Sequence, residues 1–150
     1  MRRDPRQNDP QGMTNSTTAT DHKTEAIERL YAAYGRGDVE AVLADLADDV
    51  DWQAVASSDS VPWYGAFRGK DAGPGFFAAI GDNVEIHRFD IVTMAANDTE
   101  VFVGVDWAYT VKATGRRTEM LMQHWFSFEG GKVVRFRGSE DSEQSARAFA

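Results

Sequence analysis

Four strand-like segments follow one another over residues 84–140, and they constrain the fold more than any other feature of the chain. The segments 84–94, 100–113, 119–128 and 132–140 are rich in Val, Ile, Phe, Trp and Thr, which are residues that favour β-structure. Thr114-Gly115 and Gly130-Gly131 separate the last three segments, and short turns containing glycine join antiparallel neighbours. The pattern predicts an antiparallel meander in the second half of the chain.

Helical periodicity dominates the first half. Ile27, Leu30, Tyr31 and Tyr34 lie at i, i+3, i+4 and i+7, the spacing of one apolar helix face. We expect this helix to end near Gly37. A second helix is expected after an N-cap at Asp38, with Val39, Val42, Leu43 and Leu46 on its apolar face. We also expect a strand over 50–55 and a helix over 71–80. A short C-terminal helix is expected to begin at Asp141, because Asp141 and Gln144 have the spacing of a capping box.

This element order indicates an α+β fold, with helices on one face of a curved sheet. The chain has 150 residues, which suits one domain. Residues 1–22 are polar and show no hydrophobic period, so we expect a disordered N-terminal tail, with a single domain over residues 23–150.

Composition excludes several classes of function. The chain has no cysteine, so disulfides, thiolate catalysis and Cys-ligated metal centres are excluded. Its 16 Lys and Arg against 24 Asp and Glu give a formal charge of −8, which argues against binding to nucleic acid or to an anionic membrane. No apolar run approaches the roughly 20 residues that span a bilayer, and no apolar segment follows the basic N-terminus. We therefore expect a cytoplasmic location.

The segment 119–128 is apolar on both faces. Met120, Met122, His124, Phe126 and Phe128 alternate with Leu121, Gln123 and Trp125. A sheet covered by helices on one face normally shows polar residues on the other. We expect Met120, Met122, His124, Phe126 and Phe128 to point outward and to be covered by a second copy of the chain in a homodimer.

Three stretches of sequence resemble a known family: 30–52 (LYAAYGRGDVEAVLADLADDVDW), 62–77 (PWYGAFRGKDAGPGFF) and 114–137 (TGRRTEMLMQHWFSFEGGKVVRFR). Together they are similar to the SnoaL-like and ketosteroid-isomerase-like branch of the nuclear-transport-factor-2-like superfamily, over about residues 24–142. The resemblance implies a cone: a curved antiparallel sheet wrapped around three helices, with an apolar pocket at the open end. It does not choose among isomerases, cyclases, dehydratases, hydrolases and binding domains.

Catalytic groups known in the family are missing at the matching positions. The tyrosine of ketosteroid isomerase corresponds to Leu30, its base to Ala54 and its second aspartate to Gln123. The residues used by limonene-epoxide-hydrolase-like members correspond to Val105, Trp107 and Gly138. The resemblance therefore implies the fold without either known mechanism.

The same resemblance implies an inward-facing aromatic pocket. We expect it to be lined by Leu30, Tyr34, Trp52, Ala54, Trp63, Phe67, Phe77, Trp107, Trp125, Phe136 and Gly138, although aromatic residues at such positions can equally be core.

Three residues are candidates for catalysis. Glu140 could act as an acid–base group in an aromatic pocket, or could cap the C-terminal segment. Gln123 and Tyr109 could donate hydrogen bonds to a substrate oxygen, or could be satisfied core groups.

We expect no cofactor, because the chain has neither a phosphate-binding loop nor histidines at metal-ligand spacing. The sequence favours a pocket protein for a small apolar molecule, either an acid–base enzyme or a non-catalytic binding protein. A dimeric interaction domain is the remaining alternative.

Overall fold

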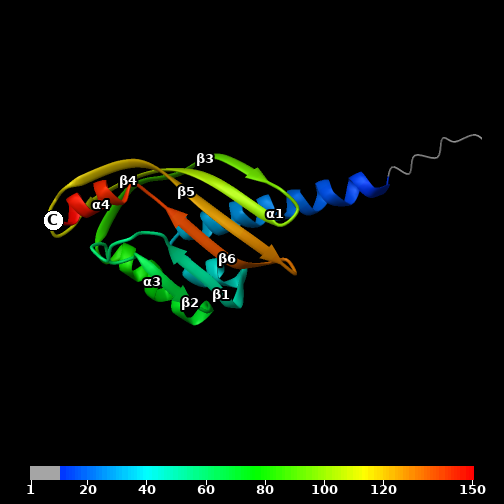
Figure 1. Ribbon diagram of the computed structural model, residues 1–150, viewed down its shortest axis with the longest axis horizontal. Helices are drawn as coiled ribbons and strands as arrows, with labels where there is room; N and C mark the ends of the chain where they lie inside the picture. The colour runs from blue at the N-terminus through cyan, green and yellow to red at the C-terminus, as the bar shows by residue number, and fades with distance from the viewer. Residues whose placement is uncertain (1–10) are drawn as a thin grey trace, which may run out of the picture.

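Six strands form one curved sheet in the order β2-β1-β6-β5-β4-β3 (Figure 1). The structure is a computed structural model that describes residues 11–150, with side chains from residue 20 onward. The strands are β1 (Leu46–Ala54), β2 (Gly65–Arg68), β3 (Val84–Ala96), β4 (Glu100–Val111), β5 (Arg117–Glu129) and β6 (Lys132–Ser139). All neighbours are antiparallel except β1 and β6, which are parallel. The predicted α+β class and meander are confirmed, and the parallel pair makes the sheet a mixed one.

Within residues 11–150, four α-helices and one 3-10 turn accompany the sheet: α1 (Gln11–Gly35), α2 (Val39–Ala44), η1 (Lys70–Ala72), α3 (Gly73–Gly81) and α4 (Ser142–Phe149). Both predicted caps are confirmed. A side-chain oxygen of Asp38 accepts from the Ala41 amide at 3.0 Å, and one of Asp141 accepts from the Gln144 amide at 3.0 Å. No helix within residues 11–150 is both long enough and apolar enough to cross a bilayer.

The first helix is longer than its apolar stripe predicts. Helix α1 begins at Gln11, whereas the sequence predicted a disordered tail over residues 1–22, of which residues 1–10 lie outside the described residues. Once a helix is nucleated, each added residue gains one backbone hydrogen bond, so the polar segment continues the amphipathic helix. Figure 1 shows these first turns of α1 reaching beyond the sheet.

The orientation of β5 differs from the one expected. In the β4–β5 register, Val103 lies opposite His124 and Val105 opposite Met122, and residues directly opposite each other share a face. Val103 and Val105 are buried, so His124 and Met122 point inward. The expected register was wrong by one residue, and such a slip exchanges the two faces of a strand.

This correction removes the predicted dimer face. Met120, Met122 and Phe126 are buried within the same chain, so they are not available to a partner. His124 lines an internal cavity, and Phe128 packs partly buried against the core.

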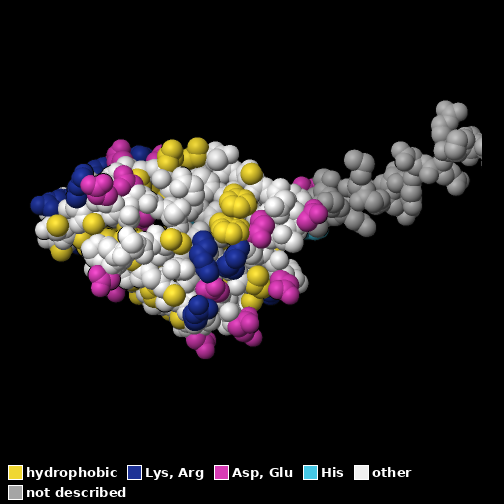
Figure 2. Space-filling view, viewed as in Figure 1, with side chains coloured by type: hydrophobic (Ala, Val, Ile, Leu, Met, Phe, Trp, Pro, Cys, Tyr) yellow, Lys and Arg dark blue, Asp and Glu magenta, His cyan; other side chains and the backbone are white. Residues whose placement is uncertain are grey.

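The outer surface of the sheet carries a different apolar group. Phe102 and Leu121 are 47% and 62% exposed. The Phe102 ring stacks on Trp125 with centroids 5.6 Å apart, and the Arg135 guanidinium lies 4.1 Å from the Trp125 ring. Figure 2 shows hydrophobic side chains beside basic ones over β5 and β6.

Candidate functional site

An apolar cavity of about 60 Å³ lies between the inner face of the sheet and helices α1 and α3. Ten of the residues named from sequence border it: Leu30, Tyr34, Trp52, Ala54, Trp63, Phe77, Trp107, Phe136, Gly138 and Glu140. Tyr31, Val55, Tyr64, Phe76, Ile80, Phe89, Met122, His124, Phe126 and Ser139 also border it. Aromatic rings fill most of the interior, so the free space is small for a ligand pocket.

Four expected site residues lie elsewhere. Gln123 is exposed on the outer face of β5, and Trp125 lies on that face against Phe102. Phe67, on β2, packs against Phe76 with centroids 5.3 Å apart. Tyr109 is fully buried, and its hydroxyl donates to Ser145 Oγ at 2.8 Å. Gln123 and Trp125 were misplaced by the register slip in β5. The placement of Phe67 and Tyr109 depends on long-range packing.

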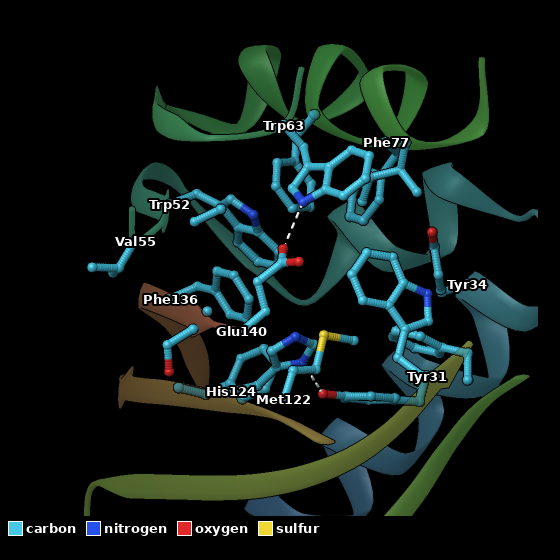
Figure 3. A pocket seen from close by; sticks show the side chains of 18 of the residues that line it. Tyr31, Tyr34, Trp52, Val55, Trp63, Phe77, Met122, His124, Phe136 and Glu140 are labelled. Atoms are coloured by element: carbon cyan, nitrogen blue, oxygen red, sulfur yellow. Dashed lines mark hydrogen bonds between the residues drawn. The ribbon is translucent and has the colours of Figure 1, made fainter. Parts of the chain in front are cut away.

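Among the described residues that border the cavity, Glu140 is the one with an acidic side chain. It lies between the end of β6 and the cap of α4, and both of its carboxylate oxygens have donors. Trp63 Nε1 donates to Oε1 at 2.7 Å, and the Ser145 hydroxyl donates to Oε2. Figure 3 shows the contact with Trp63 across the cavity. Because α4 supplies Ser145 and the loop before β2 supplies Trp63, the carboxyl group has a fixed position.

Burial dominates the electrostatics of Glu140. The loss of hydration raises its pKa above the ordinary value of 4.5, and the hydrogen bonds from Ser145 and Trp63 lower it only in part. The carboxyl group therefore exchanges a proton closer to neutral pH than an exposed glutamate does. Such a shift suits a general acid or base.

A second polar pair, Tyr31 and His124, borders the same cavity. The Tyr31 hydroxyl, from α1, makes a hydrogen bond with His124 Nδ1, from β5 (Figure 3). Burial lowers the pKa of His124 to about 3 and raises the pKa of Tyr31 well above its ordinary value. At neutral pH the imidazole is therefore uncharged and the phenol keeps its proton, so the phenol donates to Nδ1. The imidazole hydrogen then resides on Nε2.

Gly138 leaves space for this arrangement. A β-carbon at this position would lie 3.0 Å from Phe136 Cζ and 3.5 Å from His124 Cδ2. The glycine thus lets the two rings approach the backbone of β6. A larger side chain at this position would displace Phe136.

Sequence reasoning missed Tyr31 and His124 as a pair. They lie 93 residues apart, and no local spacing links them. One signal was present: the face of β5 that carries Met122 and Phe126 is the more apolar one, and that face belongs inside. Among the residues that the structure describes, no group of three or more His, Asp or Glu side chains could hold a metal ion.

A second depression adjoins the cavity. This groove of about 670 Å³ lies between the end of α1, α3 and β3. Tyr34, Phe77 and Phe89 border both spaces, so their rings separate the groove from the cavity.

Comparison with known proteins gives a family match and several structural neighbours. A family model described as a SnoaL-like domain matches residues 27–136. No curated protein matches the sequence. A solved NTF2-like protein from Burkholderia xenovorans LB400 is 27% identical, with a TM-score of 0.79, covering 87% of this chain and 98% of its own. TerC, co-crystallised with polyporic acid, is 19% identical, with a TM-score of 0.77, covering 85% and 98%. An LEH-like epoxide hydrolase from M. tuberculosis is 18% identical, with a TM-score of 0.67, covering 87% and 90%.

Proposed function

The chain belongs to the SnoaL-like domain family, and from this premise we propose that it is an enzyme that performs acid–base chemistry on a small apolar molecule. The observation that carries the proposal is Glu140. It is a partly buried carboxyl group with a raised pKa that borders a mainly apolar cavity. A proton acceptor of this kind can remove a proton from a bound substrate and return it elsewhere.

His124 supplies the complementary group in this proposal. Its Nε2–H has no acceptor among residues 20–150, and the neutral imidazole can donate to a substrate oxygen as negative charge develops there. Tyr31 is the positioning residue, because its hydroxyl selects the tautomer that carries the hydrogen on Nε2. This pair does not occupy the positions of the tyrosine and aspartates of ketosteroid isomerase.

The structural neighbours support a small-molecule role in general terms. One of them was crystallised with polyporic acid, and another is described as an epoxide hydrolase. Both are below 25% identity, so the substrate and the reaction of this chain are proposed from its own residues.

Turnover of metabolites by the purified protein tests the proposal. The protein is incubated with the low-molecular-mass extract of its producing cells, and changes are followed by liquid chromatography and mass spectrometry. We expect at least one compound to be converted by the wild type and not by Glu140→Gln. Glu143→Gln is the matched control, because Glu143 lies three residues away and is exposed at the start of α4.

A non-catalytic binding protein is the second candidate. Both oxygens of Glu140 already accept hydrogen bonds from Trp63 and Ser145, which is also the pattern of a carboxyl group that anchors α4. In that case the protein would retain a compound from the extract unchanged. Equal conversion by the wild type and by Glu140→Gln would contradict the catalytic role of Glu140.

A further inference from the structure

Two tryptophan side chains border the cavity with unpaired hydrogen-bond donors. The indole Nε1 atoms of Trp52 and Trp107 are buried and have no acceptor among the described residues. The two residues are only 5% and 3% exposed, so bulk water does not satisfy them. Buried N–H groups in native proteins nearly always have partners, and an exception calls for an explanation.

The indole N–H groups of the other two tryptophans have hydrogen-bond acceptors within the chain. Trp63 Nε1 donates to Glu140, and Trp125 Nε1 donates to Glu100 on the outer face. The unpaired indoles are both at the cavity, where a bound molecule could supply the missing acceptor.

His124 adds a third donor of the same kind. Its Nδ1 accepts from Tyr31, so Nε2 carries the hydrogen and faces no acceptor among residues 20–150. The main acceptor on the wall, the Glu140 carboxyl group, is already engaged by Trp63 and Ser145. The Tyr64 hydroxyl is also buried without a partner at this cavity, and it can either donate or accept. The cavity therefore offers more free donors than free acceptors, within walls of aromatic rings.

We propose that the cavity binds a compact, cyclic, apolar molecule with carbonyl-type acceptor oxygens, held by the indole N–H groups of Trp52 and Trp107 and by the imidazole N–H of His124. This inference rests on the proposed function, because it describes the molecule that the same cavity takes. An amine or ammonium group would meet three N–H donors and would find only the Tyr64 hydroxyl oxygen as a buried, unpaired acceptor. A hydrocarbon of the same shape would leave the donors unpaired.

Three probes of similar size separate these possibilities: cyclopentanone, methylcyclopentane and cyclopentylamine. Binding is followed by NMR of the indole ¹H–¹⁵N signals of the wild-type protein. We expect cyclopentanone to bind most tightly and to move the Trp52 and Trp107 signals downfield, as a new hydrogen bond does. The Trp125 signal should stay unchanged, because Trp125 lies on the opposite face of the sheet and is an internal control.

Trp107→Phe and Trp52→Phe remove one donor each and keep an aromatic ring. For either variant we expect roughly a 3- to 10-fold loss of affinity for cyclopentanone, the contribution of about one neutral hydrogen bond. The affinity for methylcyclopentane should stay within a factor of about two in the same variants. The dispersion of the backbone amide signals shows whether each variant is folded. One folded variant is enough to test the inference.

Two results of the binding measurements would overturn the inference. One is equal affinity of the wild type for cyclopentanone and methylcyclopentane, and the other is tightest binding of cyclopentylamine. Neither result depends on turnover. A preference for the ketone without conversion of any metabolite would contradict the proposed enzymatic function and leave this inference standing. Conversion of a compound that lacks acceptor oxygens would contradict this inference alone.

Discussion

The buried histidine makes stability depend on pH in a way that can be calculated. Burial lowers the pKa of His124 in the folded protein to about 3, from an ordinary value of 6.5. Between these two values the unfolded chain binds more protons than the folded protein, so stability falls as the pH falls. For one group with these two pKa values, the loss between pH 7 and pH 5 is about 2 kcal/mol.

Urea unfolding at both pH values measures this loss. Burial raises the pKa of Glu140, and this shift acts in the opposite direction, because the folded protein then takes up a proton first as the pH falls. The effect of His124 is therefore the difference between the wild type and His124→Gln, which should be about 2 kcal/mol over this interval. His87→Gln removes a histidine that is exposed on β3, and it should show the wild-type loss. The same pH dependence in the wild type and in His124→Gln would refute the reasoning.

Three further predictions concern packing and surfaces. Gly138→Ala should lower the free energy of unfolding in urea by about 1–3 kcal/mol, because the new β-carbon would lie 3.0 Å from the Phe136 ring. Gly75→Ala has no described atom within 4 Å of its new β-carbon and should stabilise α3 by about 0.5–1 kcal/mol. Equal effects of the two substitutions would refute this account of Gly138. Met122→Glu should prevent folding, as seen by circular dichroism, because Met122 is 5% exposed, whereas Leu121→Glu should fold, because Leu121 is 62% exposed. Phe77→Ala should join the cavity to the adjoining groove at a cost of about 2 kcal/mol, and should bind naphthalene, detected by tryptophan fluorescence, where the wild type does not.

Local signals predicted most of the fold. The apolar stripe of α1, the two aspartate caps and the glycine turns of the meander each depend on a few neighbouring residues, and the structure confirms them. Strand β2 has only four residues, too few to show an alternating pattern, so no element was expected over residues 65–68. The parallel pairing of β1 with β6 joins distant segments, so no local pattern could predict it.

The candidate site was predictable in composition and less so in arrangement. Glu140 and most of the aromatic residues that the family resemblance implied border the cavity. Gln123 was placed inside because family correspondence was given more weight than the apolar character of the opposite face, and a slip of one residue exchanges the faces. The hydrogen bond between Tyr31 and His124 joins two elements 93 residues apart, and only the folded chain brings them together.

The ionisation of Glu140 tests the central claim most directly, because the proposed acid–base role requires a carboxyl group that holds its proton closer to neutral pH. NMR of protein labelled with ¹³C at the glutamate carboxyl groups follows each titration without any substrate. Glu140→Gln assigns the signal, and the exposed Glu143 is the reference in the same spectrum. We expect Glu140 to titrate above its ordinary value of 4.5. A titration at or below that value would contradict the account.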